Sequence, residues 1–144
     1  MRLEQHDPLP FELWLSELGK LAEAAASELA EHEDRAVRRA YYLLQLAPPS
    51  LRALGDPGLA ESTIELLLEN GHAEQAARLI AGPGSTITLT RPRARHRHQA
   101  VISVAGALSA HGEGDSPALA LVGAWTGLFR KAPEHALLRL SASR

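Results

Sequence analysis

The sequence contains no cysteine, few aromatic residues and no long uninterrupted apolar run. Without cysteine, this chain cannot form a disulfide, a thiolate metal site or a cysteine nucleophile. No apolar run approaches the roughly 20 residues that a membrane-spanning helix needs, and the first residues lack the cationic and apolar regions of a signal peptide. We therefore expect a cytoplasmic protein that does not bind a membrane.

Aromatic residues make up 4% of the 144 residues although 45% are apolar, so alanine supplies much of the apolar content. Side chains this small favour closely packed helices. A chain of this length is expected to fold as a single domain, 1–144. We divide it into a helical part, 1–81, and an α/β part, 82–144.

Apolar spacing predicts four helices in the amino-terminal part. The first covers 11–30 and the second covers 33–47, where two prolines stop it. An Asp-Pro pair typical of a helix start opens the third, over 57–69, and Gly71 can end it in a left-handed conformation. A short fourth helix follows over 72–82.

The α/β part begins with STITLT, a β-branched, alternating run that predicts a strand over 85–90. AVISV (100–104) and ALSAH (107–111) predict two more strands. Together they give a three-stranded antiparallel sheet over about 85–112. With the four helices before it and two helices after it, the predicted fold class is α+β.

Ser116 and Pro117 are typical of a helix start and precede an apolar helix over 117–130; a short helix over 133–140 ends the chain. The apolar helix has almost no polar face, so it must be buried on two sides. The sheet would cover one side, and the amino-terminal helices or another subunit the other. Gly123 and Gly127 leave a flat strip on this helix, which predicts a symmetric homodimer through it or the helices packed against it.

Four arginines occupy every second position of RPRARHRH, residues 91–98, with two histidines and no acid. In a continued strand they would share the face of Ile87 and Leu89, so we place the segment in a loop between the first two strands. Such a loop can contact nucleic-acid phosphates or an acidic protein surface. The alternative is a solvated loop, or one that rests on the chain's own acidic helix. The predicted contact residues are Arg91, Arg93, Arg95, His96, Arg97 and His98.

Charge is unevenly distributed along the chain. Residues 1–35 contain nine acidic and three basic side chains, a net charge of −6, whereas residues 91–98 carry +4 and the whole chain −2. Arginine outnumbers lysine thirteen to two, a bias that GC-rich coding produces without selection for binding. Such asymmetry bears on partners and association more than on fold.

No motif of an enzyme is present: there is no nucleophile elbow, no H-E-x-x-H and no Walker loop. His111, Glu113 and Asp115 are an acid/base cluster of a kind that occurs by chance at loop ends. The glycines of 112–114 precede a helix as in a phosphate cradle, but two acids oppose an anion there, and turn formation is their commoner use. The histidines beside the arginines lack the further ligands that zinc needs. We predict a non-enzymatic protein without catalytic residues, metal or cofactor.

The segment HQAVISVAGALSAHGEGDSPALALVGAWTGLF resembles the second half of a double-stranded RNA-binding domain, in which a glycine turn and G-x-G-x-S lead to an alanine-rich helix. The resemblance covers at most about the last 70 residues, within the usual size of a domain. It implies that the segment 91–98 enters the minor groove of duplex RNA. The family's closing helix begins with phosphate-binding lysines, whereas this chain has Pro117, Ala118 and Leu121 there. The matching positions are His98, Gly106, Gly112, Gly114, Ser116, Ala120 and Ala124.

The run SPALAL, residues 116–121, is also similar to the end of small α/β-sandwich proteins of phage and prophage origin, whose helices open with Thr-Pro-Ala-Leu-Ala. We favour this resemblance because the proline-alanine start fits it. The expected function is that of a small phage-derived binding protein that uses its Arg-rich loop. Two alternatives stay open: a protein-interaction or assembly component that acts through its helices, and an inhibitor of a host nucleic-acid enzyme that uses the acidic helix 11–34.

Overall fold

The computed structural model describes residues 9–49, 51, 55, 58–91, 97–104 and 108–142, with the backbone alone beyond 131. It confirms the α+β class. The elements follow in the order α1 (Phe11–Ser27), η1 (Ala30–His32), α2 (Glu33–Gln45), α3 (Glu61–Glu69), α4 (Ala73–Ala81), β1 (Ser85–Thr90), β2 (His98–Val104), β3 (Leu108–Gly114) and α5 (Pro117–Ala142). No helix in the described part of the chain is long and apolar enough to cross a membrane.

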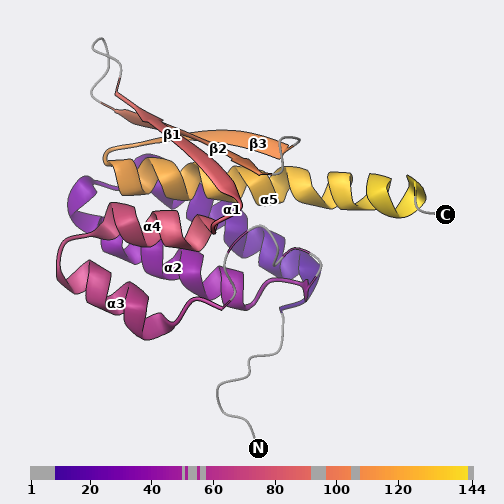
Figure 1. Ribbon diagram of the computed structural model, residues 1–144, viewed down its shortest axis with the longest axis horizontal. Helices are drawn as coiled ribbons and strands as arrows, with labels where there is room; N and C mark the ends of the chain where they lie inside the picture. The colour runs from indigo at the N-terminus through magenta and orange to yellow at the C-terminus, as the bar shows by residue number, and fades with distance from the viewer. Residues whose placement is uncertain are drawn as a thin grey trace, which may run out of the picture.

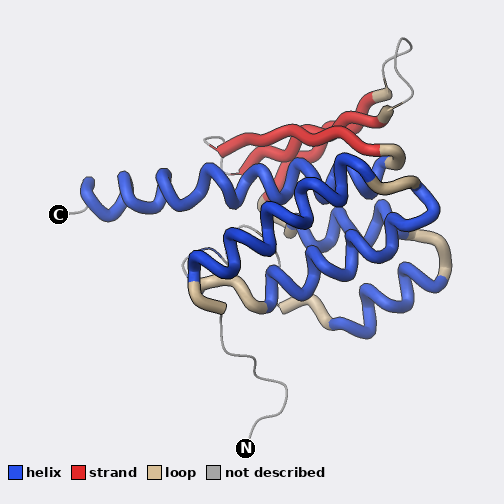
Figure 2. The backbone as a smooth tube through the Cα atoms, turned by 180° about the vertical axis from the view of Figure 1, so that it is seen from behind, coloured by secondary structure: helices blue, strands red, loops and turns tan. Residues whose placement is uncertain are grey.

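The elements form layers around α5. The sheet has the strand order β1-β2-β3, and both strand pairs are antiparallel. One face of the sheet lies on α5, while α1, α2 and α4 pack against α5 from the other side and α3 lies beyond them (Figure 1). The rear view shows all the helices on one side of the sheet (Figure 2). The expected burial of this helix on two sides is therefore met within one chain.

Three aromatic side chains of the core, those of Trp14, Trp125 and Phe129, meet between α1, α2 and α5. Trp14 is fully buried, and its ring contacts that of Phe129 edge-on, with the centroids 5.0 Å apart. Phe129 makes the same kind of contact with Trp125 at 4.6 Å. The Nε1 of Trp14 donates a hydrogen bond of 2.8 Å to the carbonyl oxygen of Leu43 in α2. One tryptophan therefore joins three helices.

Small residues allow β3 and α5 to approach each other closely. A Cβ atom added at Gly112 would lie 2.4 Å from the backbone nitrogen of Ala124, and one at Gly114 would lie 2.6 Å from the Cβ of Leu119. These contacts are too short for any side chain larger than hydrogen at the two strand positions. We call this contact the β3–α5 seam: Ala110, Gly112 and Gly114 on the strand, and Ala120, Gly123, Ala124 and Gly127 on the helix.

The seam corrects two sequence-based expectations. Gly112 and Gly114 lie within β3, which extends to Gly114, and they do not form a turn or a cradle before the helix. Gly123 and Gly127 do not form a free strip for a second subunit: Gly123 faces Gly112, and a Cβ at Gly127 would lie 2.9 Å from that of Ala110. The strip is filled by the chain's own sheet, so the predicted self-association cannot use these two glycines.

Helix ends show where local signals succeeded and failed. Ser116 accepts a hydrogen bond from the backbone nitrogen of Leu119 with its Oγ, and α5 begins at Pro117, as predicted. Gly71 follows α3 with a φ of 76°, which confirms its left-handed conformation. In contrast, α3 begins only at Glu61 and not at 57, because Ala60 is extended (φ −79°, ψ 140°).

Other helix boundaries also differ from those predicted: α2 ends at Gln45 and not at 47, and α4 is one residue shorter at each end. The first helix ends at Ser27 and not at 30, because Glu28 is extended (φ −70°, ψ 152°) and a separate turn, η1, follows. The two carboxy-terminal helices predicted over 117–130 and 133–140 are one continuous helix, α5, which includes Pro133. A proline removes a single backbone donor, and here the helix continues on both sides of it.

Candidate nucleic-acid interface

The structure places three of the six predicted contact residues; Arg93, Arg95 and His96 lie outside the described residues. Arg91 is exposed and directly follows β1. Arg97 is half-buried and directly precedes β2. His98 is the first residue of β2, paired with Gly114, and it lies on the same side of the sheet as the buried Ala100. His98 is therefore a strand residue and not part of the predicted loop.

Arg97 contacts the end of α1. Its Nη2 donates a hydrogen bond of 2.5 Å to the carbonyl oxygen of Ala26, in the last turn of that helix. The last turn of α1 contains no basic residue of its own, and a cation stabilises the partial negative charge of a helix carboxy terminus. For Arg97, the structure therefore agrees with the alternative in which the segment 91–98 rests on the acidic helix. The acceptor is a backbone carbonyl and not an acidic side chain.

A second hydrogen bond joins the sheet to the segment that follows α1, this time from the end of β3. The Oδ2 of Asp115, just after β3, accepts a hydrogen bond of 2.7 Å from the backbone nitrogen of Ala30, where η1 begins. A carboxylate is the favoured charge at a helix amino terminus. Of the three neighbouring groups His111, Glu113 and Asp115, the last therefore has a structural contact with η1.

Polar side chains cover the outer face of the sheet, the face turned away from α5. Antiparallel register and strand alternation bring nine residues together on it. They form three rows across the strands: Thr86, Ser103 and Ser109; Thr88, Val101 and His111; Thr90, Gln99 and Glu113. Val101, 39% exposed, is the one apolar member. Sequence analysis missed this face, although the threonine at every second position of 85–90 was a signal for it.

Hydroxyl, amide and imidazole groups of this kind bind sugar and phosphate oxygens, which accept hydrogen bonds. The carboxylate of Glu113 disfavours an anion at one end of the outer face. Gln99 reaches it, with its Nε2 3.4 Å from Oε1 of Glu113. Glu113 is the one acid in the described part of the three strands. The described residues contain no group of three or more His, Asp or Glu side chains that could hold a metal ion.

Charge divides between the two parts of the chain. Residues 1–81 contain 14 acidic and 7 basic side chains, a net charge of −7, whereas residues 82–144 contain 3 acidic and 8 basic side chains, a net charge of +5. The sheet belongs to the basic part and the helices α1 to α4 to the acidic part. The outer face therefore belongs to the basic part of the chain, although its own nine residues include one acid and no lysine or arginine.

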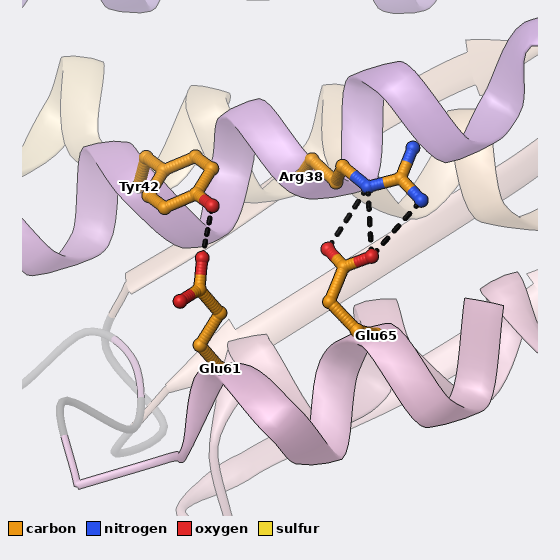
Figure 3. A network of polar contacts seen from close by, with 4 residues as sticks. All are labelled: Arg38, Tyr42, Glu61 and Glu65. Atoms are coloured by element: carbon orange, nitrogen blue, oxygen red, sulfur yellow. Dashed lines mark hydrogen bonds and ion pairs between the residues drawn. The ribbon is translucent and has the colours of Figure 1, made fainter. Parts of the chain in front are cut away.

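A polar network joins α2 to α3 on the acidic side of the molecule (Figure 3). Arg38 forms hydrogen bonds of 2.9 to 3.2 Å to both carboxylate oxygens of Glu65, and the hydroxyl of Tyr42 donates to Glu61. The hydrogen bond from Arg38 lowers the pKa of Glu65. The hydrogen bond to Glu61 raises the pKa of the Tyr42 hydroxyl. Both shifts hold these groups in their ordinary charge states at neutral pH, so the network positions α3 and is not suited to acid/base catalysis.

Comparison of the chain with protein-family models, with curated proteins and with solved structures found no significant match. The functional proposal therefore depends on the geometry and charge of the outer face.

The contact between Arg97 and α1 gives a stability prediction. We expect Arg97→Ala to lower the free energy of unfolding by about 0.5–1.5 kcal/mol, the usual value of one hydrogen bond, because the carbonyl of Ala26 loses its donor. Arg91→Ala is the matched control, since it removes the same charge from an exposed position at the other end of the segment. Urea denaturation of both variants tests this. Equal stabilities would show that the Arg97 contact contributes nothing.

Proposed function

We propose that this chain is a non-enzymatic binding protein that contacts the backbone of a double-stranded nucleic acid through the outer face of its sheet and the adjoining basic segment. The observation that carries the proposal is a polar, helix-free face of the sheet in the basic part of the chain, next to the Arg-rich segment 91–98. Arg91 lies where this face meets the basic segment. The hydroxyls of the outer face and the arginines of the adjoining segment are groups that suit phosphate and sugar contacts, which fix position without reading sequence.

The proposed mode differs from that of the double-stranded RNA-binding domain. The element order α4-β1-β2-β3-α5 supports that resemblance, but the start of α5 is not free to bind phosphate. Ser116 is buried and caps the helix, and Asp115 bonds to Ala30. We therefore assign the contact to the outer face and not to the helix amino terminus. The outer face has no Phe, Tyr or Trp side chain on which a base could stack, which favours duplexes over single strands.

A binding titration against duplex RNA, duplex DNA and single strands at two salt concentrations tests this function. We expect duplex binding that weakens with salt, since each neutralised phosphate contributes about −0.9 to the slope of log K against log salt on duplex DNA. Arg91→Glu should weaken binding and reduce that slope by about one. Flat curves for all three nucleic acids at low salt would contradict the proposal.

Arg78→Glu is the matched control for this experiment. It makes the same change in net charge, but Arg78 lies on α4 in the acidic part, where it pairs with Glu74 at 3.1 Å. Equal losses for the two variants would show that only the overall charge matters, which would contradict the assignment to the outer face.

A further inference from the structure

The two edge strands of the sheet, β1 and β3, differ in how far the rest of the chain covers them. At the β3 edge, α1 packs beside the strand, and the Nζ of Lys131 donates a hydrogen bond of 2.5 Å to the backbone carbonyl of Ser109. Lysines and covering helices are common ways to block an exposed edge. At the β1 edge, the described part of the chain provides no comparable cover, since β1 packs chiefly against β2.

β1 itself has none of the features that protect an edge strand. Its six residues pair with β2 one to one, without a bulge, and they include no charged residue and no proline. In such a strand every second residue directs its backbone N–H and C=O away from the sheet. An edge of this kind is a template for another strand.

Burial on the inner side of β1 is also incomplete. Ile87 and Leu89 face the core but are only partly buried, whereas their partners Ile102 and Ala100 in β2 are fully buried. A strand added beyond β1 would cover these two apolar side chains. The edge therefore offers both backbone groups and apolar surface to a partner.

The residues of β1 identify a second copy of this chain as the partner. Thr86-Ile87-Thr88-Leu89-Thr90 matches itself when it is reversed about Thr88. In an antiparallel pair centred there, threonine meets threonine on the outer face, and Ile87 of one copy meets Leu89 of the other on the inner side. Pairs of hydroxyl residues and pairs of large apolar residues are both stabilising across strands. We infer that β1 pairs with β1 of a second copy about a twofold axis through Thr88, which gives a symmetric homodimer with a six-stranded sheet.

Charge is compatible with this arrangement. Arg91 follows β1 and would lie opposite Ser85 of the other copy, next to the end of α4. The carboxy terminus of a helix carries partial negative charge, which attracts a guanidinium. The two Arg91 residues would be about 20 Å apart along the strands, well beyond the Debye length of about 8 Å at physiological salt. The two Arg91 residues therefore do not oppose the pairing, and the axis is of the isologous kind found in most dimers.

Light scattering of the protein after size exclusion, at tens of micromolar, tests this inference. We expect about 31 kDa, twice the 15.5 kDa of one chain. Thr88→Lys and Thr88→Glu should each give a monomer, because residue 88 faces itself across the axis and like charges directly opposite each other are destabilising. An equimolar mixture of the two variants should return to 31 kDa as a heterodimer. The exposed position of Thr88 predicts that both variants stay folded, with a melting temperature lowered only by the stability that the dimer adds.

His111→Lys is the matched control. It adds the same charge to the same row of the outer face, but on β3, two strands or roughly 10 Å from Thr88. This variant should remain a dimer. A wild-type mass near 15.5 kDa, a Thr88→Lys dimer, or a mixture that stays monomeric would each overturn the inference, as would loss of the dimer in His111→Lys alone. None of these outcomes depends on nucleic-acid binding.

Discussion

Gly112→Ala should destabilise the protein by about 3 kcal/mol or more, at the upper end of what overpacking causes. The new Cβ would lie 2.4 Å from the nitrogen of Ala124 and 2.7 Å from both the carbonyl oxygen of Ala120 and the carbonyl carbon of Gly123. All three are backbone atoms of α5, so no side chain can turn away to relieve the contact. The helix would have to shift, and it is packed on its other side by α1, α2 and α4.

Gly84→Ala is the control for this variant. A Cβ at Gly84 meets nothing within 4 Å, and its φ is not positive. Replacing glycine by alanine at such a site is expected to be neutral or to stabilise by up to about 1 kcal/mol, through the unfolded chain. Urea denaturation of the two variants measures the difference. Similar midpoints for Gly112→Ala and Gly84→Ala would show that β3 and α5 are not in close contact.

Trp14→Ala should reduce stability by about 3–5 kcal/mol, as expected for the loss of a fully buried aromatic ring. The ring touches Phe129, and its Nε1 binds the carbonyl oxygen of Leu43, one of the last four carbonyls of α2. Such carbonyls have no partner within their own helix. The variant therefore leaves both a cavity between three helices and a buried acceptor without a donor.

Trp14→Phe separates these two effects. It keeps an aromatic ring but removes the donor, so we expect an intermediate loss of about 1–3 kcal/mol for the unsatisfied carbonyl. Leu13→Ala, at the neighbouring position with half of its side chain exposed, should have little effect. Thermal melts of the three variants should rank in this order. A Trp14→Phe variant as stable as the wild type would show that the Leu43 contact is not required.

Local patterns in the sequence were sufficient for most elements of the fold. The β-branched alternation of 85–90 predicted β1 to the residue, and the glycine at 71 and the serine at 116 marked helix ends that the structure confirms. These signals depend only on residues close together in the chain. The extended conformation of Ala60 overrode the helix-start signal three residues before it, because local propensity is weaker than the packing of the whole chain.

The role of the glycines could not be predicted, because it depends on two segments that meet only in the folded protein. Glycine is depleted in strands, so residues 112–114 were assigned to a turn. Gly123 and Gly127 were interpreted as a surface for another subunit. The structure shows that Gly123 on α5 faces Gly112 on β3, and that Gly127 faces Ala110 of the same strand. The outer face of the sheet was missed for a similar reason, since its three rows exist only after the register of the strands is known.

The distribution of charge has a consequence for how the molecule meets others in solution. Its net charge of −2 repels a polyanion, but the charge is divided unevenly, −7 over residues 1–81 and +5 over residues 82–144, and an uneven charge sets up an uneven electrostatic field. Fields of this kind act over several ångströms and rotate a diffusing protein before contact. Under the proposed function, this uneven field favours encounters in which the basic part of the chain meets the polyanion first. The orientation of the first contact then depends on the uneven distribution of charge and not on the net charge.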